Sequence, residues 1–248
     1  MDDAATRLSN RHTPVYPALW FLIVVFLLAR VLEMFSPRVP LLAIIALNVL
    51  SSTAFALLHG TLRYTVRGIL AFFVMFLVIT GVIENVGVLT GFPFGHYYFT
   101  EVMGPKLFVV PLFLSLAYLG MAYVSWTLSG AILGGARPSL AGSSVVATPL
   151  MASFIMVAWD LAMDPVWSNV AHAWVWTQGG PYFGVPIKNF LGWYFTNYAC
   201  YQSFAFYARG GFSKTNPQPL GYWRMAVLFY AICALGNILP FWGARAAR

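Results

Sequence analysis

The stretch Gly68–Leu89, with the sequence GILAFFVMFLVITGVIENVGVL, decides the fold class. Its 22 residues include one ionisable side chain, Glu84. A helix of about 20 predominantly apolar residues crosses the hydrocarbon core of a bilayer, which is roughly 30 Å thick. A helix on the surface of a soluble protein would instead carry a polar face. The stretch therefore predicts a transmembrane helix.

Similar apolar runs, bounded by proline, glycine or charge, occur along the whole chain. The predicted spans are Tyr16–Phe35, Pro40–Leu58, Gly68–Leu89, Leu107–Leu128, Val145–Asp164, Asn189–Ala208 and Tyr222–Trp242. Strands of a transmembrane barrel would alternate apolar and polar residues over about ten positions, and these runs do not. The sequence predicts an all-α, polytopic membrane helical bundle of about seven transmembrane helices.

The composition leaves no room for a separate soluble domain. Of the 248 residues, 60% are hydrophobic and 8% are charged, whereas about a quarter of the residues of a soluble domain are charged. We expect one integral membrane domain over residues 1–248, with a short N-terminal tail at 1–15. The net charge of +7 comes from basic residues that fall mostly between the apolar runs. Membrane topology explains such a distribution, so no nucleic-acid partner is expected.

The distribution of basic residues also predicts an orientation. Loops on one side carry Arg7, Arg11, Arg63, Arg67, Arg137, Arg209, Lys214 and Arg224. Loops on the other side carry Arg38, Lys106, Lys188, Arg245 and Arg248. The side richer in basic residues is expected to be cytoplasmic. This places the N-terminus inside and the C-terminus outside, in what we expect to be a prokaryotic inner membrane.

Two long loops, Thr90–Lys106 and Pro165–Lys188, are aromatic and poor in charge, and both fall on the non-cytoplasmic side. For most of their rings we favour an aromatic belt at the membrane interface. The alternative is a lid over a lipophilic pocket, because loops of this length are often functional.

Ionisable residues within membrane spans are costly, and each one requires a reason. Five lie toward the outer ends of the first, third and fifth spans, namely Arg30, Glu33, Glu84, Asp160 and Asp164. They should therefore share one depth. Asp160 and Asp164 are four residues apart, so their carboxyl groups share a helix face and resist double ionisation. Pro165 is expected to end the helix at Asp164.

Each of these residues also has an alternative, structural role. An ion pair near the interface is our preferred interpretation of Arg30 and Glu33, which are three residues apart. Asp160 and Asp164 could cap loops or bind backbone amides. Glu84 could pair with Arg30 or bond to Asn85 and the following loop. A group of neutral carboxylic acids in this position would instead suit general acid catalysis.

The sequence offers no metal site and no covalent cofactor site. The histidines His12, His59, His96 and His172 lie near predicted termini or loops, without the spacing of metal ligands. The last predicted span contains no lysine, which argues against a retinal Schiff base. We expect no metal and no cofactor.

Several ordered motifs between Glu84 and Trp193 resemble those of a known family. They are Glu84-Asn85-Val86-Gly87, Gly91-Phe92-Pro93-Phe94-Gly95-x-Tyr97-Tyr98, Gly104-Pro105-Lys106-Leu107, Asp160-Leu161 with Asp164-Pro165, Trp174-Val175-Trp176, Tyr182-Phe183-Gly184-Val185-Pro186 and Asn189-Phe190-x-Gly192-Trp193. This core, residues 84–193, resembles the membrane carotenoid biosynthesis family of acyclic-carotenoid hydratases, which includes bisanhydrobacterioruberin hydratase and enzymes of the lycopene 1,2-hydratase type. One departure is Val109-Val110-Pro111, where the family pattern is Gly-Val-Pro.

The resemblance implies a lyase of the hydro-lyase class that acts without a cofactor. Its substrates would be water and a lipophilic polyene in the bilayer, and association with other carotenoid enzymes is expected. Such an enzyme adds water to the terminal double bond of an acyclic carotenoid and leaves a tertiary alcohol. We assign the acid to Asp160 or Asp164, with the other aspartate and Glu84 positioning or deprotonating water. Predicted substrate-binding residues are Phe94, Tyr97, Tyr98, Trp159, Asn189 and Trp193.

Two other functions stay open at this point. A carotenoid end-group cyclase would use the same protonation, followed by attack of an internal double bond. A non-catalytic carotenoid carrier or a transporter would use the outer carboxyl groups as a binding site or proton relay.

Overall fold

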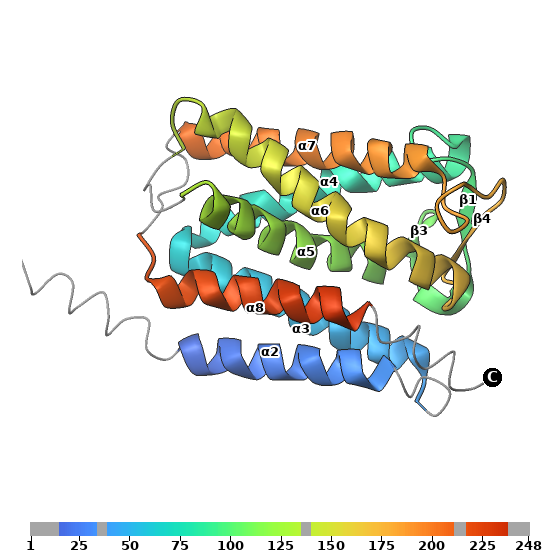
Figure 1. Cartoon of the computed structure of the whole chain (residues 1–248), viewed down its shortest axis with the longest axis horizontal. Helices are drawn as coiled ribbons and strands as arrows, with labels where there is room; N and C mark the ends of the chain where they lie inside the picture. The colour runs from blue at the N-terminus through green and yellow to red at the C-terminus, as the bar shows by residue number, and fades with distance from the viewer. Residues whose placement is uncertain (1–14, 34–38, 135–139, 211–216, 238–248) are drawn as a thin grey trace, which may run out of the picture.

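The computed structural model describes residues 15–33, 39–134, 140–210 and 217–237. In these ranges seven long helices run side by side (Figure 1). They are α2 (Val15–Leu32), α3 (Leu41–Arg63), α4 (Val66–Thr90), α5 (Leu112–Ile132), α6 (Ser144–Asn169), α7 (Ile187–Arg209) and α8 (Leu220–Gly236). The predicted all-α membrane bundle is thus confirmed.

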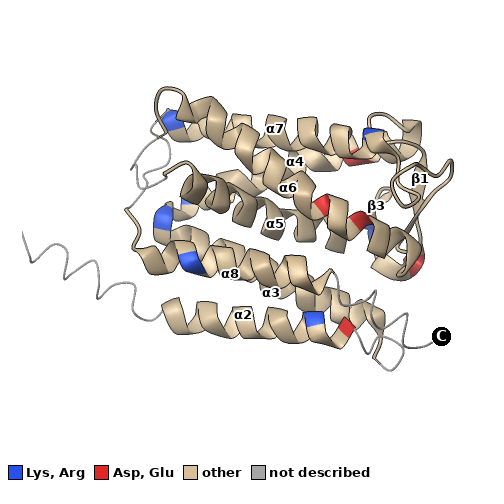
Figure 2. Ribbon diagram, in the orientation of Figure 1, with Lys and Arg blue, Asp and Glu red and all other residues tan. Residues whose placement is uncertain are grey.

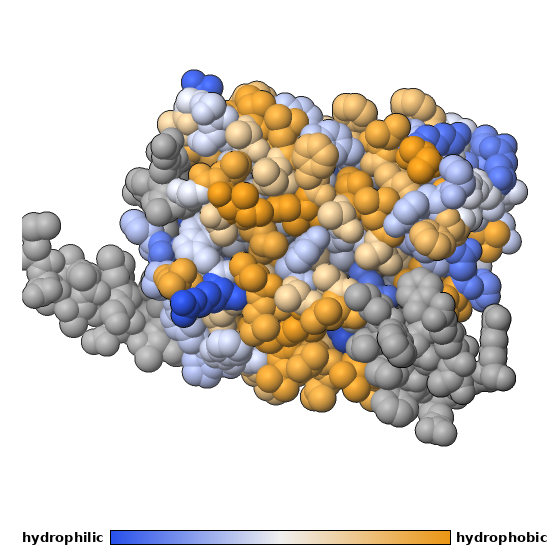
Figure 3. Space-filling view, viewed as in Figure 1, coloured by the Kyte–Doolittle hydropathy of each residue, from blue (hydrophilic) through white to orange (hydrophobic). Residues whose placement is uncertain are grey.

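Five of these helices, α2 to α6, are long and apolar enough to cross a membrane. The other two differ for separate reasons. Helix α8 has 17 residues and is shorter. Helix α7 has 23 residues but buries Asn189, Thr196, Asn197 and Gln202, so polar groups inside the bundle lower its mean hydropathy. On the outside, Figure 3 shows hydrophobic residues over much of the middle of the visible face.

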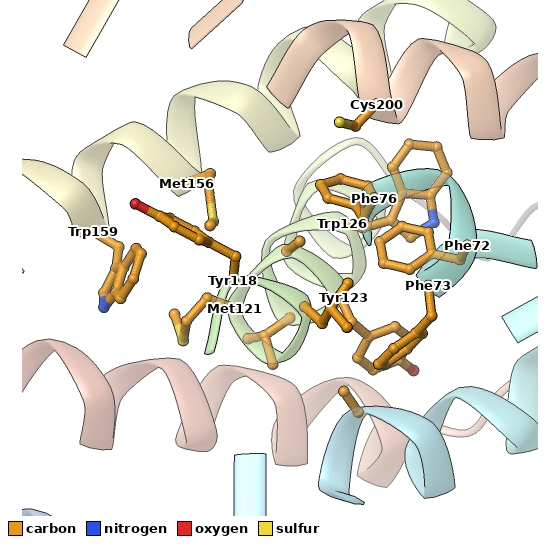
Figure 4. Packing of buried hydrophobic residues seen from close by; sticks show 14 of the residues in the cluster. Phe72, Phe73, Phe76, Tyr118, Met121, Tyr123, Trp126, Met156, Trp159 and Cys200 are labelled. Atoms are coloured by element: carbon orange, nitrogen blue, oxygen red, sulfur yellow. The ribbon is translucent and has the colours of Figure 1, made fainter. Parts of the chain in front are cut away.

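Helix α5 lies at the centre of the bundle and packs against α3, α6 and α8. Every residue from Tyr118 to Thr127 is buried. Figure 4 shows the side chains of Tyr118, Met121, Tyr123 and Trp126 among those of the surrounding helices. Gly120 allows the close approach of α3, because a Cβ atom at this position would lie 2.8 Å from Ser52 Oγ. Small residues at such crossings favour helix packing in membranes.

Three helix boundaries differ from the predictions. Helix α3 continues to Arg63, which places His59 inside the bundle instead of near a terminus. There His59 Nδ1 lies 2.7 Å from Tyr123 Oη and Nε2 lies 3.0 Å from the carbonyl oxygen of Tyr222. Helix α5 begins at Leu112, because Lys106–Leu107 (β2) and Val110–Pro111 (β3) form a short antiparallel pair. The Val-Val-Pro departure lies in this pair, ahead of the helix.

The prediction that α6 ends at Asp164 was wrong, since the helix continues through Pro165 to Asn169. A proline inside a helix has no N–H group for the carbonyl four residues earlier. The freed carbonyl of Leu161 accepts a hydrogen bond from Tyr182 Oη at 3.2 Å. The same happens at Pro149, where the carbonyl of Val145 accepts from Gln202 Nε2 at 3.2 Å. Side chains that follow α6 in the sequence thus satisfy both carbonyl groups, and the helix is not interrupted.

The two long aromatic loops lie at the same end of the bundle, as predicted, and the structure adds that they pair with each other. Tyr97–Phe99 (β1) pairs antiparallel with Trp174–Trp176 (β4), with Tyr97 opposite Trp176 and Phe99 opposite Trp174. A 3₁₀ turn, η2 (Glu101–Met103), follows β1. We call β1 and β4 together the lid.

The described charges are distributed unevenly along the bundle. Figure 2 shows acidic residues only toward the lid end. Arg63, Arg67, Arg209 and Arg224 belong to helix turns at the opposite end. Residues 1–14 lie outside the described residues. So do the other basic residues from which the orientation was predicted: Arg7, Arg11, Arg38, Arg137, Lys214, Arg245 and Arg248. Which end faces the cytoplasm stays a prediction.

Candidate active site

The two aspartates of α6 lie beneath the lid. Asp160 and Asp164 are one helical turn apart, and both are buried. Asn189, in the first turn of α7, donates from Nδ2 to Asp164 Oδ2 at 2.7 Å and more weakly to Asp160 Oδ2 at 3.4 Å. One amide group therefore holds both carboxyl groups. Asn189, which was predicted to bind substrate, bonds to both aspartates in the structure and also lines the cavity described below.

The lid supplies two further donors to Asp164. Trp174 Nε1 and Trp176 Nε1 donate to the same oxygen, Oδ1, at 2.8 and 3.2 Å. Residues two apart in a strand share a face, which explains why both indoles reach one carboxyl group. The interfacial-belt interpretation was therefore wrong for these two rings. With three N–H donors directed at it, Asp164 has the surroundings of a carboxylate, which only accepts hydrogen bonds.

Glu84 reaches the same region from α4. Tyr97 Oη of the lid donates to Glu84 Oε1 at 2.7 Å. Burial raises the pKa of the Tyr97 phenol well above its usual range, so the hydroxyl stays protonated and acts as the donor. The other oxygen, Glu84 Oε2, is buried and has no hydrogen-bond partner among the described residues. A buried oxygen without a partner is costly, and it is costlier when the group is charged, so this position favours a neutral carboxyl group and a ligand that can bond to it.

The other partners considered for Glu84 are engaged elsewhere. Arg30 Nη1 donates to Glu33 Oε1 at 2.8 Å, which confirms the predicted ion pair and excludes a pair between Arg30 and Glu84. The Asn85 amide donates to the carbonyl of Gly81 at 2.7 Å and accepts from the backbone N–H of Val109 at 3.3 Å.

Glu84, Asp164 and Asn189 line one cavity of about 250 Å³, together with aromatic rings from the lid and the helices. The remaining lining residues are Tyr97, Phe99, Leu114, Tyr118, Trp174, Trp176 and Trp193. Asp160 does not line this cavity but lies one turn away on α6. The structure thus brings two of the three predicted catalytic carboxyl groups to one apolar chamber and places the third behind them.

The predicted substrate-binding residues have different positions. Tyr97 and Trp193 line the cavity, whereas Trp159 lines a neighbouring one. Tyr98 is 51% exposed, occupies the outer face of β1 and is not among the residues that line the cavity. Phe94 is fully buried and stacks on Trp193 with 4.7 Å between ring centroids, so it supports the wall of the cavity.

Two glycines explain how Phe94 fits. A Cβ atom at Gly87 of α4 or Gly192 of α7 would lie 2.6 or 2.9 Å from the Phe94 ring. The ring therefore packs between two helices that lack side chains at these positions. Two stacked contacts form a column of rings. Phe94 stacks on Trp193, and Trp193 stacks on Tyr118 with ring centroids 4.4 Å apart.

Sequence reasoning missed five residues of the cavity wall as site residues, namely Phe99, Leu114, Tyr118, Trp174 and Trp176. Trp174 and Trp176 carried a usable signal, because a W-x-W pattern places both rings on one face of a strand. Phe99 is two residues after Tyr97 in the paired strand and shares its face. Tyr118 carried no signal, since it is one aromatic residue within an apolar helix.

Comparison with known proteins gives one match. Residues 38–244 match the model of a family described as carotenoid biosynthesis protein. No curated protein and no solved structure matches the chain. The family match includes the lid, α4, α5, α6 and α7, and therefore every residue of the cavity.

Proposed function

This chain belongs to the carotenoid biosynthesis protein family, and we propose that it hydrates the terminal carbon–carbon double bond of an acyclic carotenoid without a cofactor. One observation carries the proposal. Glu84, with a buried oxygen that has no partner among the described residues, and Asp164, with three N–H donors, face the same aromatic cavity.

The two environments suggest different roles for the two carboxyl groups. A proton on Glu84 Oε2 would convert the unpartnered oxygen into a donor directed at the substrate. Asp164 is surrounded by donors that suit a carboxylate. We therefore assign the acid to Glu84 and the base to Asp164, a reversal of the roles expected from the sequence. Two carboxyl groups with opposite protonation states are a common basis for acid and base chemistry at one pH.

The reaction can be balanced with these groups alone. Glu84 transfers its proton to the less substituted carbon of the terminal double bond, and the π electrons form the new C–H bond. The tertiary cation that results is captured by water, whose oxygen forms the new C–O bond. Asp164 accepts the proton that this oxygen releases. Transfer of that proton back to Glu84 through water restores the starting state, and the net change is the addition of one water molecule.

The rest of the site supports this sequence of steps. Tyr118 and Trp174 line the cavity, and a desolvated cation over an aromatic face gains about 2 kcal/mol. Trp193 also lines it but is stacked on Phe94 and Tyr118. Asn189 holds Asp160 beside Asp164. Because two adjacent carboxyl groups resist double ionisation, Asp160 carries a proton while Asp164 is ionised.

The test is expression with a lycopene-producing pathway and identification of the pigments by mass. Glu84→Gln and Asp164→Asn should each lower product formation by about 10²-fold or more, the usual effect of losing a general acid or base. Glu101→Gln is the matched control, because Glu101 is an exposed carboxyl group near the lid that pairs with Lys106 at 2.9 Å. Product made in D₂O should carry one deuterium at a non-exchanging carbon.

The same experiment separates the alternatives. A product with the mass of the substrate but a changed spectrum would indicate a cyclase. Unchanged pigment bound to the protein would indicate a carrier. Normal rates in both Glu84→Gln and Asp164→Asn would refute the assignment of these carboxyl groups.

The orientation is part of the proposal as well. We place the lid on the outer side of a prokaryotic inner membrane, where the enzyme would associate with other carotenoid enzymes. The side chain of Glu101 is 90% exposed, and Cys200 and Cys233 are buried. Glu101→Cys should therefore react with a membrane-impermeant thiol reagent in intact cells, and protection until lysis would reverse the orientation.

A further inference from the structure

A second, larger cavity lies beside the first and has a different chemistry. Its walls enclose about 600 Å³, including space that is open to the surroundings, against about 250 Å³ for the first cavity. Residues of α2, α3, α5, α6 and α8 line it, and Leu114 and Trp174 belong to the walls of both cavities. Most of the wall is apolar, with Met121, Met163 and Trp159 among its residues. The polar side chains that face it belong mainly to one buried cluster.

That cluster consists of Arg30, Glu33, Asn48 and Asn237, which are linked in a chain of hydrogen bonds. Asn48 Nδ2 donates to Glu33 Oε1 at 2.6 Å, and Arg30 Nη1 donates to the same oxygen at 2.8 Å. Arg30 Nη2 donates to Asn237 Oδ1. Gly236 leaves room for this arrangement, because a Cβ atom there would collide with the guanidinium group of Arg30.

These partners fix the orientation of both amides. The Glu33 carboxylate can accept hydrogen bonds but cannot donate them. Asn48 must therefore donate to Glu33 through Nδ2, and Asn48 Oδ1 is left free. The Arg30 guanidinium group can donate hydrogen bonds but cannot accept them. Asn237 must therefore accept through Oδ1, and Asn237 Nδ2 is left free. Asn48 Oδ1 and Asn237 Nδ2 are both buried and have no hydrogen-bond partner among the described residues. Both residues line the cavity.

Asn48 Oδ1 is thus a free acceptor and Asn237 Nδ2 a free donor, and Arg30 Nε and Trp159 Nε1 are two more buried donors of lining residues that have no partner among the described residues. A hydroxyl group donates one hydrogen bond and can accept two, so it matches one acceptor surrounded by several donors. We propose that the cavity binds an apolar chain with a single hydroxyl group, such as a hydroxylated isoprenoid, whose hydroxyl donates to Asn48 Oδ1 and accepts from Asn237 Nδ2. Glu33 neutralises Arg30, so the site favours a neutral alcohol over a carboxylic acid. The inference is independent of the proposed hydration, because it concerns another cavity and requires no reaction.

The test is equilibrium binding to the full chain in detergent or nanodiscs, measured by quenching of tryptophan fluorescence. The probes are all-trans-retinol, its methyl ether and retinoic acid. The ether accepts a hydrogen bond but cannot donate to Asn48, and the acid is charged. Retinol should bind about tenfold more tightly than the ether, the usual effect of one unmade buried hydrogen bond. It should also bind more tightly than the acid.

Three variants locate the site. Ala117→Phe fills the cavity, since Ala117 lines it, and should abolish binding of both retinol and the ether. Ala199→Phe makes the same change in an outer groove between α4 and α7 and should leave both affinities unchanged. Asn48→Leu removes the free acceptor and should abolish the preference for retinol over the ether. If Asn48→Leu does not fold, the probe series and the two phenylalanine variants still decide the question.

The proposal is overturned by equal binding of retinol and its ether, by tighter binding of retinoic acid, or by binding that Ala199→Phe abolishes and Ala117→Phe does not. Glu84→Gln and Asp164→Asn should bind retinol like the unaltered protein. The two proposals can therefore fail separately. Normal hydration in these two variants would refute the hydration roles alone, and equal binding of retinol and its ether would refute the alcohol site alone.

Discussion

Replacement of Tyr97 by phenylalanine removes one oxygen atom and tests how the lid serves the site. The Tyr97 hydroxyl provides the one hydrogen bond that the described residues direct to the Glu84 carboxyl group, at 2.7 Å. Without it, both oxygens of a buried carboxyl group would have no partner. Leaving such a group unsatisfied costs about 1–3 kcal/mol. For a chain of this size, each kcal/mol corresponds to roughly 2–4 °C in the unfolding midpoint.

The neighbouring residue provides a matched control. Tyr98→Phe removes the same atom from a ring that is half exposed on the outer face of β1. A surface change of this kind is expected to alter stability by less than about 0.5 kcal/mol. Thermal unfolding in detergent measures both variants, and product formation in the lycopene-producing host measures the effect on chemistry. Tyr97→Phe should lower both, whereas Tyr98→Phe should change neither.

A double variant makes the reasoning sharper. Replacing both partners of a buried hydrogen bond with apolar groups is often nearly neutral. Tyr97→Phe combined with Glu84→Met should therefore be at least as stable as Tyr97→Phe alone, although it should be inactive. Equal unfolding midpoints for Tyr97→Phe and Tyr98→Phe would refute the role of this hydrogen bond. A double variant whose loss of stability equals the sum of the losses in Tyr97→Phe and Glu84→Met would also refute it.

Three further predictions concern the elements that support the site. Tyr182→Phe should destabilise the protein by about 1 kcal/mol, because the carbonyl of Leu161 loses its partner. In a Pro165→Ala background the restored N–H group can bond to this carbonyl, so an unchanged effect of Tyr182→Phe in that background would contradict the explanation. Gly192→Ala should lower stability by about 1–3 kcal/mol through contact with Phe94, whereas Gly221→Ala, with nothing within 4 Å, serves as the control in the same unfolding assay. Asn189→Leu should lower product formation about tenfold or more by releasing Asp160 and Asp164, and normal turnover would show that the two carboxyl groups do not need this amide.

The helices could be predicted from the sequence because one physical requirement dominates them. A segment in hydrocarbon must satisfy its backbone hydrogen bonds internally and present apolar side chains, so its pattern is continuous and long. The ends were less predictable where local rules have exceptions. The proline rule placed the end of α6 at Asp164, and it failed because Tyr182, 17 residues after Pro165, satisfies the carbonyl that the proline frees.

The lid could not be predicted in the same way. Strands of three residues are too short to show a reliable alternating pattern, and η2, β2, β3, α5 and α6 lie between β1 and β4 in the sequence. Their pairing brings Tyr97 opposite Trp176, a contact that no local signal encodes. The carboxyl groups of the site were identified because ionisable residues are rare in membrane spans. Their partners were not, because aromatic residues are common in loops at the membrane interface.

The carboxyl groups of the site and their hydrogen-bond donors come from different parts of the fold, and this bears on how the site works. The carboxyl groups of Glu84 and Asp164 come from membrane helices, but the hydroxyl and indole donors that act on them come from the lid. A bundle without a folded lid would therefore hold buried carboxyl groups with fewer partners, a costly state inside a membrane. The lid and the charged site thus stabilise each other, because each supplies hydrogen-bond partners that the other requires. It follows that lid substitutions on the inner face should change stability and chemistry together, while those on the outer face should change neither.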